Sequence, residues 1–234
     1  MKKTLFCIIF LVFLSTFSFA LEKKGGGKMT QNIFWLGHDT FRIEAENVIY
    51  TDPFQLKGNP KLADIILITH EHYDHCSPAD VKKILKKDTV IVTVADAAKK
   101  LTGNIKIVKA GEKINVKGTE ISAVPSYNTN KSFHPKGKGW VGFIFTANGK
   151  RIYIAGDTDV IPEMKNFNVD IAMLPVSGTY VMTAEEAVNA ALAIKPKVAI
   201  PMHYGGIVGT EKDAEKFKAM LKGKIEVEIK KQTN

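Results

Sequence analysis

The stretch of the chain richest in chemistry is the motif HEHYDH at residues 70–75, which holds three of the six histidines of the sequence. It directly follows residues 64–69, a short apolar run typical of a buried central strand. Imidazoles and a carboxylate in an apolar setting are costly unless they have partners. A cation satisfies all of them at once, because neutral imidazole and carboxylate are common ligands of zinc and related metals. The motif therefore predicts a metal site.

The spacing within this motif suggests two adjacent ions. His70 and His72 are two residues apart, so in an extended or tightly turned backbone both can face one ion. Asp74 and His75 follow, where the chain turns toward a helix, and these two can face a second ion nearby.

Two later segments place similar residues after strands. In YIAGDTD, residues 153–159, Asp157 follows an apolar run and Gly156 permits a close approach of the backbone. In PMHYG, residues 201–205, His203 has the same placement. Alone, each is a weak signal, because an aspartate after a strand is more often a turn residue and a lone histidine is more often a surface or packed residue. Together with the first motif they form a coherent set, because we expect the strand ends of one sheet to converge in space.

These three motifs, His-x-His-x-Asp-His, Gly-Asp-Thr and Pro-Met-His, resemble those of the metallo-β-lactamase superfamily over nearly the whole chain from Gly37 onward. The pattern is most similar to the branch that contains the ascorbate-phosphate lactonase and many uncharacterised metal-dependent hydrolases. The resemblance implies an α+β fold, a four-layer αββα sandwich. Two facing mixed β-sheets would carry helices on the outside, with the metals at one edge where the sheets meet.

The resemblance also implies a role for each ligand. His70 and His72 would bind the first metal, and Asp157 would bridge both. The second metal would be bound by Asp74, His75 and His203. A further histidine is needed on the loop between the motifs, and His134 is the only histidine there. The alternative for His134 is a loop residue that contacts substrate.

Several other residues are expected near this site. His38 resembles a motif common in the branch, and we expect it beside the metals, not as a ligand. Asp52 is either an acceptor that orients a ligand imidazole or a turn cap. Tyr180 and Lys136 could hold a leaving group or an anionic substrate. Cys76 is interpreted as a small packed residue.

Two positions depart from relatives within the superfamily. The best-known dizinc β-lactamases have cysteine where Asp157 stands, so the superfamily name should describe the fold and not the substrate. Many relatives have histidine three residues earlier, where this chain has Ile154. The surroundings of the metals should therefore be less polar here.

The elements that must position these residues follow from local patterns. Helices are predicted at 78–85, 96–101, 183–194 and 210–221, and Ser77, Thr183 and Thr210 are suited to cap three of them. A β-meander is predicted over 106–124, and a hairpin turns at Asn148-Gly149. Residues 125–139 form a long polar loop, which in a compact domain is usually functional. Further strands are expected at 32–36, 40–43, 48–51, 64–69, 89–94, 140–146, 151–155, 170–174, 198–201 and 225–229.

The chain begins with the three-part pattern of a secretory signal peptide. Lys2 and Lys3 precede the apolar residues 5–19, and Ser18-Phe19-Ala20 offers a cut after Ala20. We therefore divide the 234 residues into a signal peptide (1–20), a flexible linker (21–30) and one hydrolase domain (31–234). The protein is then exported to the periplasm or beyond the cell, with no stable membrane anchor. Two alternatives are an uncleaved anchor and a cytoplasmic product that starts at Met29.

Charge and cysteine content limit the partners. Without Lys2 and Lys3, 31 basic and 24 acidic residues remain, a net charge of +7. The lysines are scattered, which favours a solvated surface and argues against nucleic acid as a partner. Removal of Cys7 with the signal leaves only Cys76, so no internal disulfide can form.

The sequence thus predicts a metal-dependent hydrolase with two divalent ions. Zinc suits the ligands best, and manganese, iron or nickel are compatible. A bridging hydroxide would cleave an ester, lactone or phosphodiester bond in a small molecule, while Asp74 orients the hydroxide and accepts a proton. The alternatives are a nuclease or phosphodiesterase of the RNase Z type and a non-catalytic protein that retains metal. The oligomeric state is left open.

Overall fold

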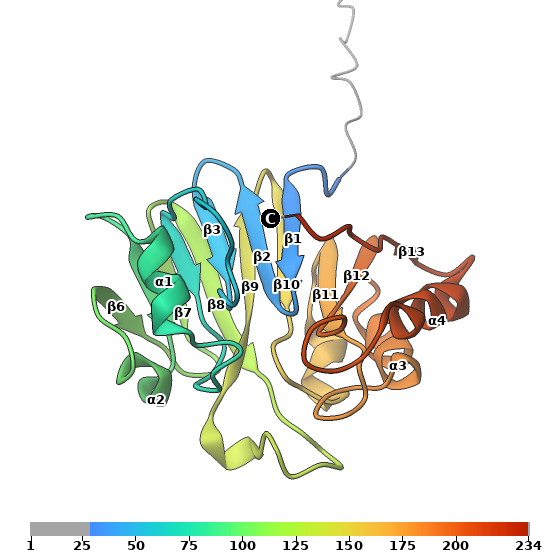
Figure 1. Cartoon of the computed structure of the whole chain (residues 1–234). Coiled ribbons are helices and arrows are strands. Elements are labelled where there is room, and N and C mark those ends of the chain that lie inside the picture. The colour runs from blue at the N-terminus through green and yellow to red at the C-terminus, as the bar shows by residue number, and fades with distance from the viewer. Residues whose placement is uncertain (1–28, 234) are drawn as a thin grey trace, which may run out of the picture.

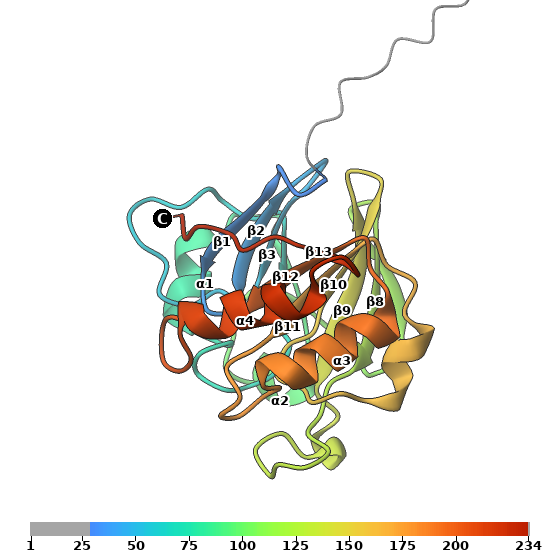
Figure 2. The same cartoon turned by 90° about the vertical axis from the view of Figure 1, so that its right-hand side faces the viewer.

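The computed structural model describes residues 29–233. The predicted signal peptide lies outside these residues, as does the predicted linker apart from Met29 and Thr30. Within the described part, two mixed β-sheets face each other and helices cover their outer faces (Figures 1 and 2). The predicted α+β sandwich of four layers is confirmed.

The first sheet has the strand order β1-β2-β3-β4-β5-β6. The first three strands are antiparallel and the last four run parallel, β3 being common to both sets. Its central strand, β4, consists of three apolar residues with no exposed surface, as expected of a strand buried on both faces. The strands are β1 (Ile33–Gly37), β2 (Thr40–Glu44), β3 (Val48–Thr51), β4 (Ile65–Leu67), β5 (Val90–Thr93) and β6 (Asn104–Ile107).

The second sheet has the order β13-β12-β11-β10-β9-β8-β7. Strands β7 to β10 are antiparallel, and β10 to β13 are parallel. They are β7 (Lys113–Val116), β8 (Thr119–Pro125), β9 (Val141–Ala147), β10 (Lys150–Ile154), β11 (Ile171–Pro175), β12 (Val198–Met202) and β13 (Glu226–Val227).

The helices connect parallel strands on the outer faces. Helices α1 (Pro78–Ile84) and α2 (Ala95–Ala98) belong to the first sheet. Helices α3 (Ala184–Ile194) and α4 (Glu211–Leu221) lie side by side over the second sheet (Figure 2). Along residues 29–233, no helix is both long and apolar enough to cross a membrane.

Several local signals act as predicted. The Ser77 hydroxyl accepts a hydrogen bond from the backbone of Asp80 at the start of α1. Thr183 and Glu186 form the capping box of α3. Asn148 and Gly149 both have positive φ, +50° and +66°, as a tight hairpin turn between β9 and β10 requires.

The predicted β-meander over 106–124 is wrong in its first strand. Strand β6 pairs in parallel with β5 at the edge of the first sheet, and only β7 and β8 form a hairpin, which turns at Gly118. The short helix α2 carries the chain from β5 to β6 as a crossover, after which the chain passes to the second sheet. Glycines at turns mark where strands end, but the partner of each strand depends on tertiary packing.

Candidate metal centre

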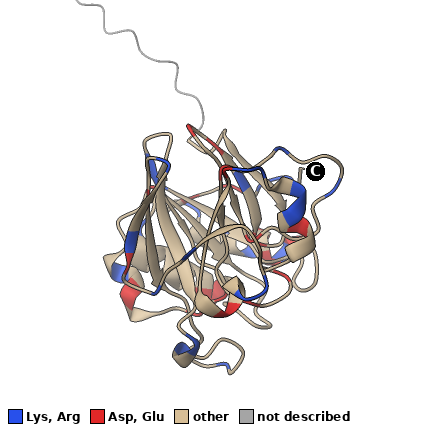
Figure 3. Cartoon of the chain, turned by 90° about the vertical axis from the view of Figure 1, so that its left-hand side faces the viewer, with Lys and Arg blue, Asp and Glu red and all other residues tan. Residues whose placement is uncertain are grey.

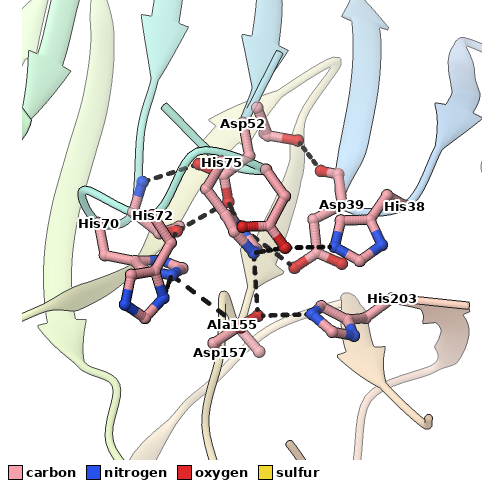
Figure 4. A network of polar contacts seen from close by, with 12 residues as sticks. His38, Asp39, Asp52, His70, His72, His75, Ala155, Asp157 and His203 are labelled. Atoms are coloured by element: carbon pink, nitrogen blue, oxygen red, sulfur yellow. Dashed lines mark hydrogen bonds and ion pairs between the residues drawn. The ribbon is translucent and has the colours of Figure 1, made fainter. Parts of the chain in front are cut away.

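The structure brings all seven predicted ligands together at one end of the molecule. The expectation that they follow strands of a single sheet was wrong: β4 belongs to the first sheet, whereas β10 and β12 belong to the second. The cluster therefore lies where the two sheets meet, as the resemblance implied (Figure 4). The loop of residues 126–139, which extends below the sheets in Figure 1, contributes His134. The ligands predicted from sequence are His70, His72, Asp74, His75, His134, Asp157 and His203.

One set of donors consists of three imidazoles. The Nδ1 atom of His72 lies 3.1 Å from Nε2 of His70 and 3.2 Å from Nε2 of His134. The indole ring of Trp140 packs against His70 and His72, with centroid distances of 4.8 and 4.7 Å. The first set is therefore walled by an aromatic ring on one side.

The second set combines carboxylate and imidazole. His75, His203 and Asp74 offer ligand atoms close together, and His38 joins them because its Nε2 lies 3.1 Å from Oδ2 of Asp74. His38 thus lies beside the centre, as predicted. Because His38 belongs to the same cluster, the expectation that it does not bind metal stays a prediction.

Asp157 lies between the two sets. Its Oδ2 is 3.1 Å from Nε2 of His134, while its Oδ1 is 3.3 Å from Nε2 of His75 and 3.2 Å from Nε2 of His203. Only 4% of the residue is exposed. Burial by itself would raise the pKa of Asp157, but the imidazoles of His203, His75 and His134 outweigh burial and hold this pKa well below its usual range. The two oxygens of Asp157 thus face different sets of donor atoms.

The donor atoms fit cations better than they fit one another. Within residues 29–233, Nε2 of His75, Nε2 of His203 and Oδ1 of Asp157 are buried without a hydrogen-bond partner, although they face each other. Such atoms are costly unless a cation satisfies them. The spacing of 3.1–3.2 Å in the imidazole set is also suitable. Nitrogens about 2.0–2.1 Å from a tetrahedral zinc ion lie about 3.3–3.4 Å apart.

Comparison with known proteins agrees with this geometry. Residues 32–203 match the family described as the β-lactamase superfamily domain. The chain belongs to the metallo-β-lactamase superfamily. A UPF0173 metal-dependent hydrolase of Methanopyrus kandleri is 34% identical over 207 residues, which cover 80% of this chain and 89% of the relative. The protein is accordingly a metal-dependent hydrolase.

Solved structures show the same fold. A protein of Parabacteroides distasonis described as a metal-dependent hydrolase superposes with a TM-score of 0.77 at 37% identity, covering 86% of this chain and 93% of its own. Igni18, a metallo hydrolase of Ignicoccus hospitalis, has a TM-score of 0.70 at 24% identity, with coverage of 86% and 95%. At that identity, the second likeness shows the fold alone.

Four imidazoles of the cluster are held by a contact to Nδ1, the ring nitrogen that faces away from the other donor atoms. Such contacts fix the tautomer and the direction of a ligand ring. The Nδ1 contacts are His70 with Oγ1 of Thr69 at 3.0 Å, His75 with Oδ2 of Asp52 at 2.9 Å, His134 with Oδ1 of Asn128 at 3.2 Å, and His203 with Oγ of Ser177 at 2.9 Å. Asp52 therefore contacts the imidazole of a predicted ligand, as one of its two predicted roles requires.

Several residues near the centre were missed in the sequence, among them Thr69, Trp140, Ser177, Asn128 and Asp39. Ser177 follows β11. Residues 170–174 repeat the pattern of residues 64–69, an aspartate followed by an apolar run, and this repetition could have indicated a functional residue after β11. Asn128 stands in a long loop where no local pattern marks it. Asp39 is fully buried with Oδ2 3.7 Å from Nδ1 of His75, and burial raises the pKa of its carboxyl to about 7. Nothing but the fold reveals that contact.

The structure places the three remaining predicted residues in different surroundings. Tyr180 lines a hollow over the candidate metal centre. Lys136 instead contacts the hydroxyl of Tyr127 and the carboxylate of Glu163, at 3.4 and 3.5 Å. Cys76 is 2% exposed, and burial raises the pKa of its thiol to about 11, so its interpretation as a packed residue is confirmed.

Gly156 permits a close approach between the two sheets. Its φ is +61°, and a Cβ atom there would stand 2.9 Å from Cβ of Thr69. The hydroxyl of Thr69 contacts Oδ2 of Asp52 at 2.7 Å and Nδ1 of His70 at 3.0 Å. A side chain at 156 would therefore push on Thr69 and Asp52, which contact the predicted ligands His70 and His75.

We expect Gly156→Ala to lower the free energy of unfolding by about 1–3 kcal/mol, because it adds a clash to an unfavourable φ. Urea unfolding of the chelated protein measures this loss, and a metal titration should show weaker binding. Gly149→Ala is the matched control, since its φ is +66° but no atom lies within 4 Å of the added Cβ. Equal losses in both variants would show that the contact with Thr69 has no effect.

Proposed function

We propose that this hydrolase binds two divalent metal ions, preferably zinc, and cleaves an ester, lactone or phosphodiester bond in a small molecule. The observation that carries the proposal is the position of Asp157, each of whose oxygens faces a separate set of donors. The first ion would be held by His70, His72 and His134. The second would be held by Asp74, His75 and His203, with Asp157 common to both.

The bound ions would supply Lewis acidity, which lowers the pKa of water toward about 7 and polarises the bond to be cleaved. Asp74 then orients the attacking water and accepts its proton. Its side chain is 13% exposed and lines the hollow, and Nε2 of His38 at 3.1 Å holds its orientation. Trp140 and the imidazoles exclude solvent from the inner side of the centre.

The surface supports a small-molecule substrate over RNA. On the face shown in Figure 3, lysines and arginines are interspersed with acidic residues over several elements. The hollow over the centre measures about 240 Å³, below the roughly 300–1,000 Å³ of many ligand pockets. A nuclease of the RNase Z type would need a continuous basic track for its substrate.

Elemental analysis tests the proposal directly. Protein purified without added metal should carry about two ions per protomer, and chelation should remove the metal together with turnover of p-nitrophenyl acetate or bis(p-nitrophenyl) phosphate. Re-addition of zinc should restore both. Turnover that survives complete removal of metal would overturn the proposal. Full metal content without turnover of any ester would favour the non-catalytic alternative, and RNA binding with steep salt dependence the nuclease.

A further inference from the structure

The hollow over the metal centre has a polar floor and an apolar rim. Its floor is formed by ligands predicted above, namely His72, Asp74, His134 and Asp157. Its rim is formed by Tyr73, Phe133, Tyr180 and Ile207. A molecule whose reacting bond lies at the floor must therefore place its remaining atoms against apolar side chains.

Exposed large apolar side chains of the described residues gather at this rim. Seven large apolar side chains are exposed among residues 29–233, and three of them line this one hollow: Tyr73 at 65%, Phe133 at 48% and Ile207 at 39%. They come from three separate segments, after β4, in the long loop and after β12. Exposed apolar groups that gather at one place usually mark a binding surface.

Aromatic contacts hold part of this rim in place. Phe133 meets Tyr180 edge to face, with 4.8 Å between ring centroids. Asn128 ties their two loops together, because its side-chain amide donates to the carbonyl of Tyr180 at 3.1 Å and accepts from the backbone of His134. The apolar wall is therefore part of the same framework that holds a predicted ligand.

The rim offers no cation to an anionic substrate. Among residues 29–233, no lysine or arginine lines the hollow. The lysines of the long loop pair with acidic side chains instead: Lys131 with Asp159 at 2.7 Å, Lys136 with Glu163 at 3.5 Å and Lys138 with Glu71 at 3.3 Å. Proteins that select phosphate groups usually surround them with arginine or lysine.

We propose, on the basis of the function proposed above, that the substrate is an uncharged carboxylic ester or lactone with an apolar group of several carbons. That group lies against Phe133, Tyr180 and Ile207. In the reaction, the oxygen of water forms a bond to the acyl carbon and the bond to the alcohol oxygen breaks. Asp74 accepts one proton of the water and passes it to the leaving alkoxide, and the other proton is released from the new acid.

Turnover by the zinc-loaded enzyme tests the selectivity. The value of kcat/KM should rise at least about tenfold from p-nitrophenyl acetate to the hexanoate, since each buried methylene contributes favourably. It should also exceed that for bis(p-nitrophenyl) phosphate. In Phe133→Ala the ratio of hexanoate to acetate should fall to about threefold or less, with unchanged metal content. Ile107→Ala removes an isoleucine that is 55% exposed on β6, outside the hollow, and should keep the wild-type ratio.

Binding without turnover gives a second measurement. Ligand-observed NMR on the zinc-loaded protein should show 2-octanone binding at least about tenfold more tightly than 2-butanone, and Phe133→Ala should abolish the difference. This measurement holds even if the chemistry proposed above is wrong.

The outcomes separate the two proposals. Turnover of esters with no dependence on chain length, or preference for the phosphodiester, overturns the apolar substrate and leaves the hydrolase function standing. No turnover of any ester overturns the proposed reaction, while the ketones still decide the apolar site. Equal binding of both ketones, together with a dimer that Phe133→Ala alone dissociates, would assign the rim to a second copy of the chain.

Discussion

Replacing Asp157 by asparagine is expected to remove most bound metal and to lower turnover at least about 1,000-fold. An amide keeps the volume of the side chain but removes the charge, and only one of its two outer atoms can bind a cation. The carboxylate is 4% exposed and faces His134 on one side and His75 and His203 on the other. Loss of this group should therefore weaken both binding positions. Metal per protomer and turnover of p-nitrophenyl hexanoate measure the effect.

Asp80→Asn is the matched control for this experiment. Asp80 is also buried, 6% exposed, but it binds the backbone amides of Gln55 and Leu56 and the ammonium group of Lys83. Its replacement should reduce stability without changing metal content. If Asp157→Asn retained two ions per protomer, the bridging role would be wrong, whatever happened to turnover.

The second large effect is expected for Asp52→Ala. The carboxylate of Asp52 has no exposed surface and accepts hydrogen bonds from the backbone and the hydroxyl of Thr69, at 2.8 and 2.7 Å. It also contacts Nδ1 of His75 at 2.9 Å. Removing one partner of such a buried group costs about 3–5 kcal/mol of unfolding free energy. Metal affinity should fall about 10–100-fold, because His75 loses the contact that orients its ring.

Urea unfolding of the chelated protein and a zinc titration measure these two losses. Asp52→Asn should show a smaller loss of stability, since one amide oxygen still accepts and asparagine tolerates the backbone φ of +37° at this position. Metal affinity that is unchanged in Asp52→Ala would mean that Asp52 serves only as a turn cap, the alternative left open by the sequence.

Much of the centre was predicted because its signals are local. The motif of residues 70–75 directly follows a buried strand, and histidines in that position have few explanations other than a cation. The same holds for the cap at Ser77 and the turn at Asn148-Gly149, where a few neighbouring residues decide the backbone. Such features depend on short-range sterics and hydrogen bonding, so they are legible in the sequence alone.

The tertiary structure decided which segments, far apart in the sequence, come into contact. Only packing of the whole chain shows that β6 joins β5, and local patterns did not show that the centre lies between two sheets, which only the superfamily resemblance implied. The same is true of Asn128 against His134 and of Phe133 against Tyr180. The sequence by itself determined the metal-binding motifs, most of the secondary structure and the superfamily resemblance. The structure alone decided strand partners, the residues that orient the imidazoles and the apolar rim, because each depends on side chains that meet only after the sheets have packed.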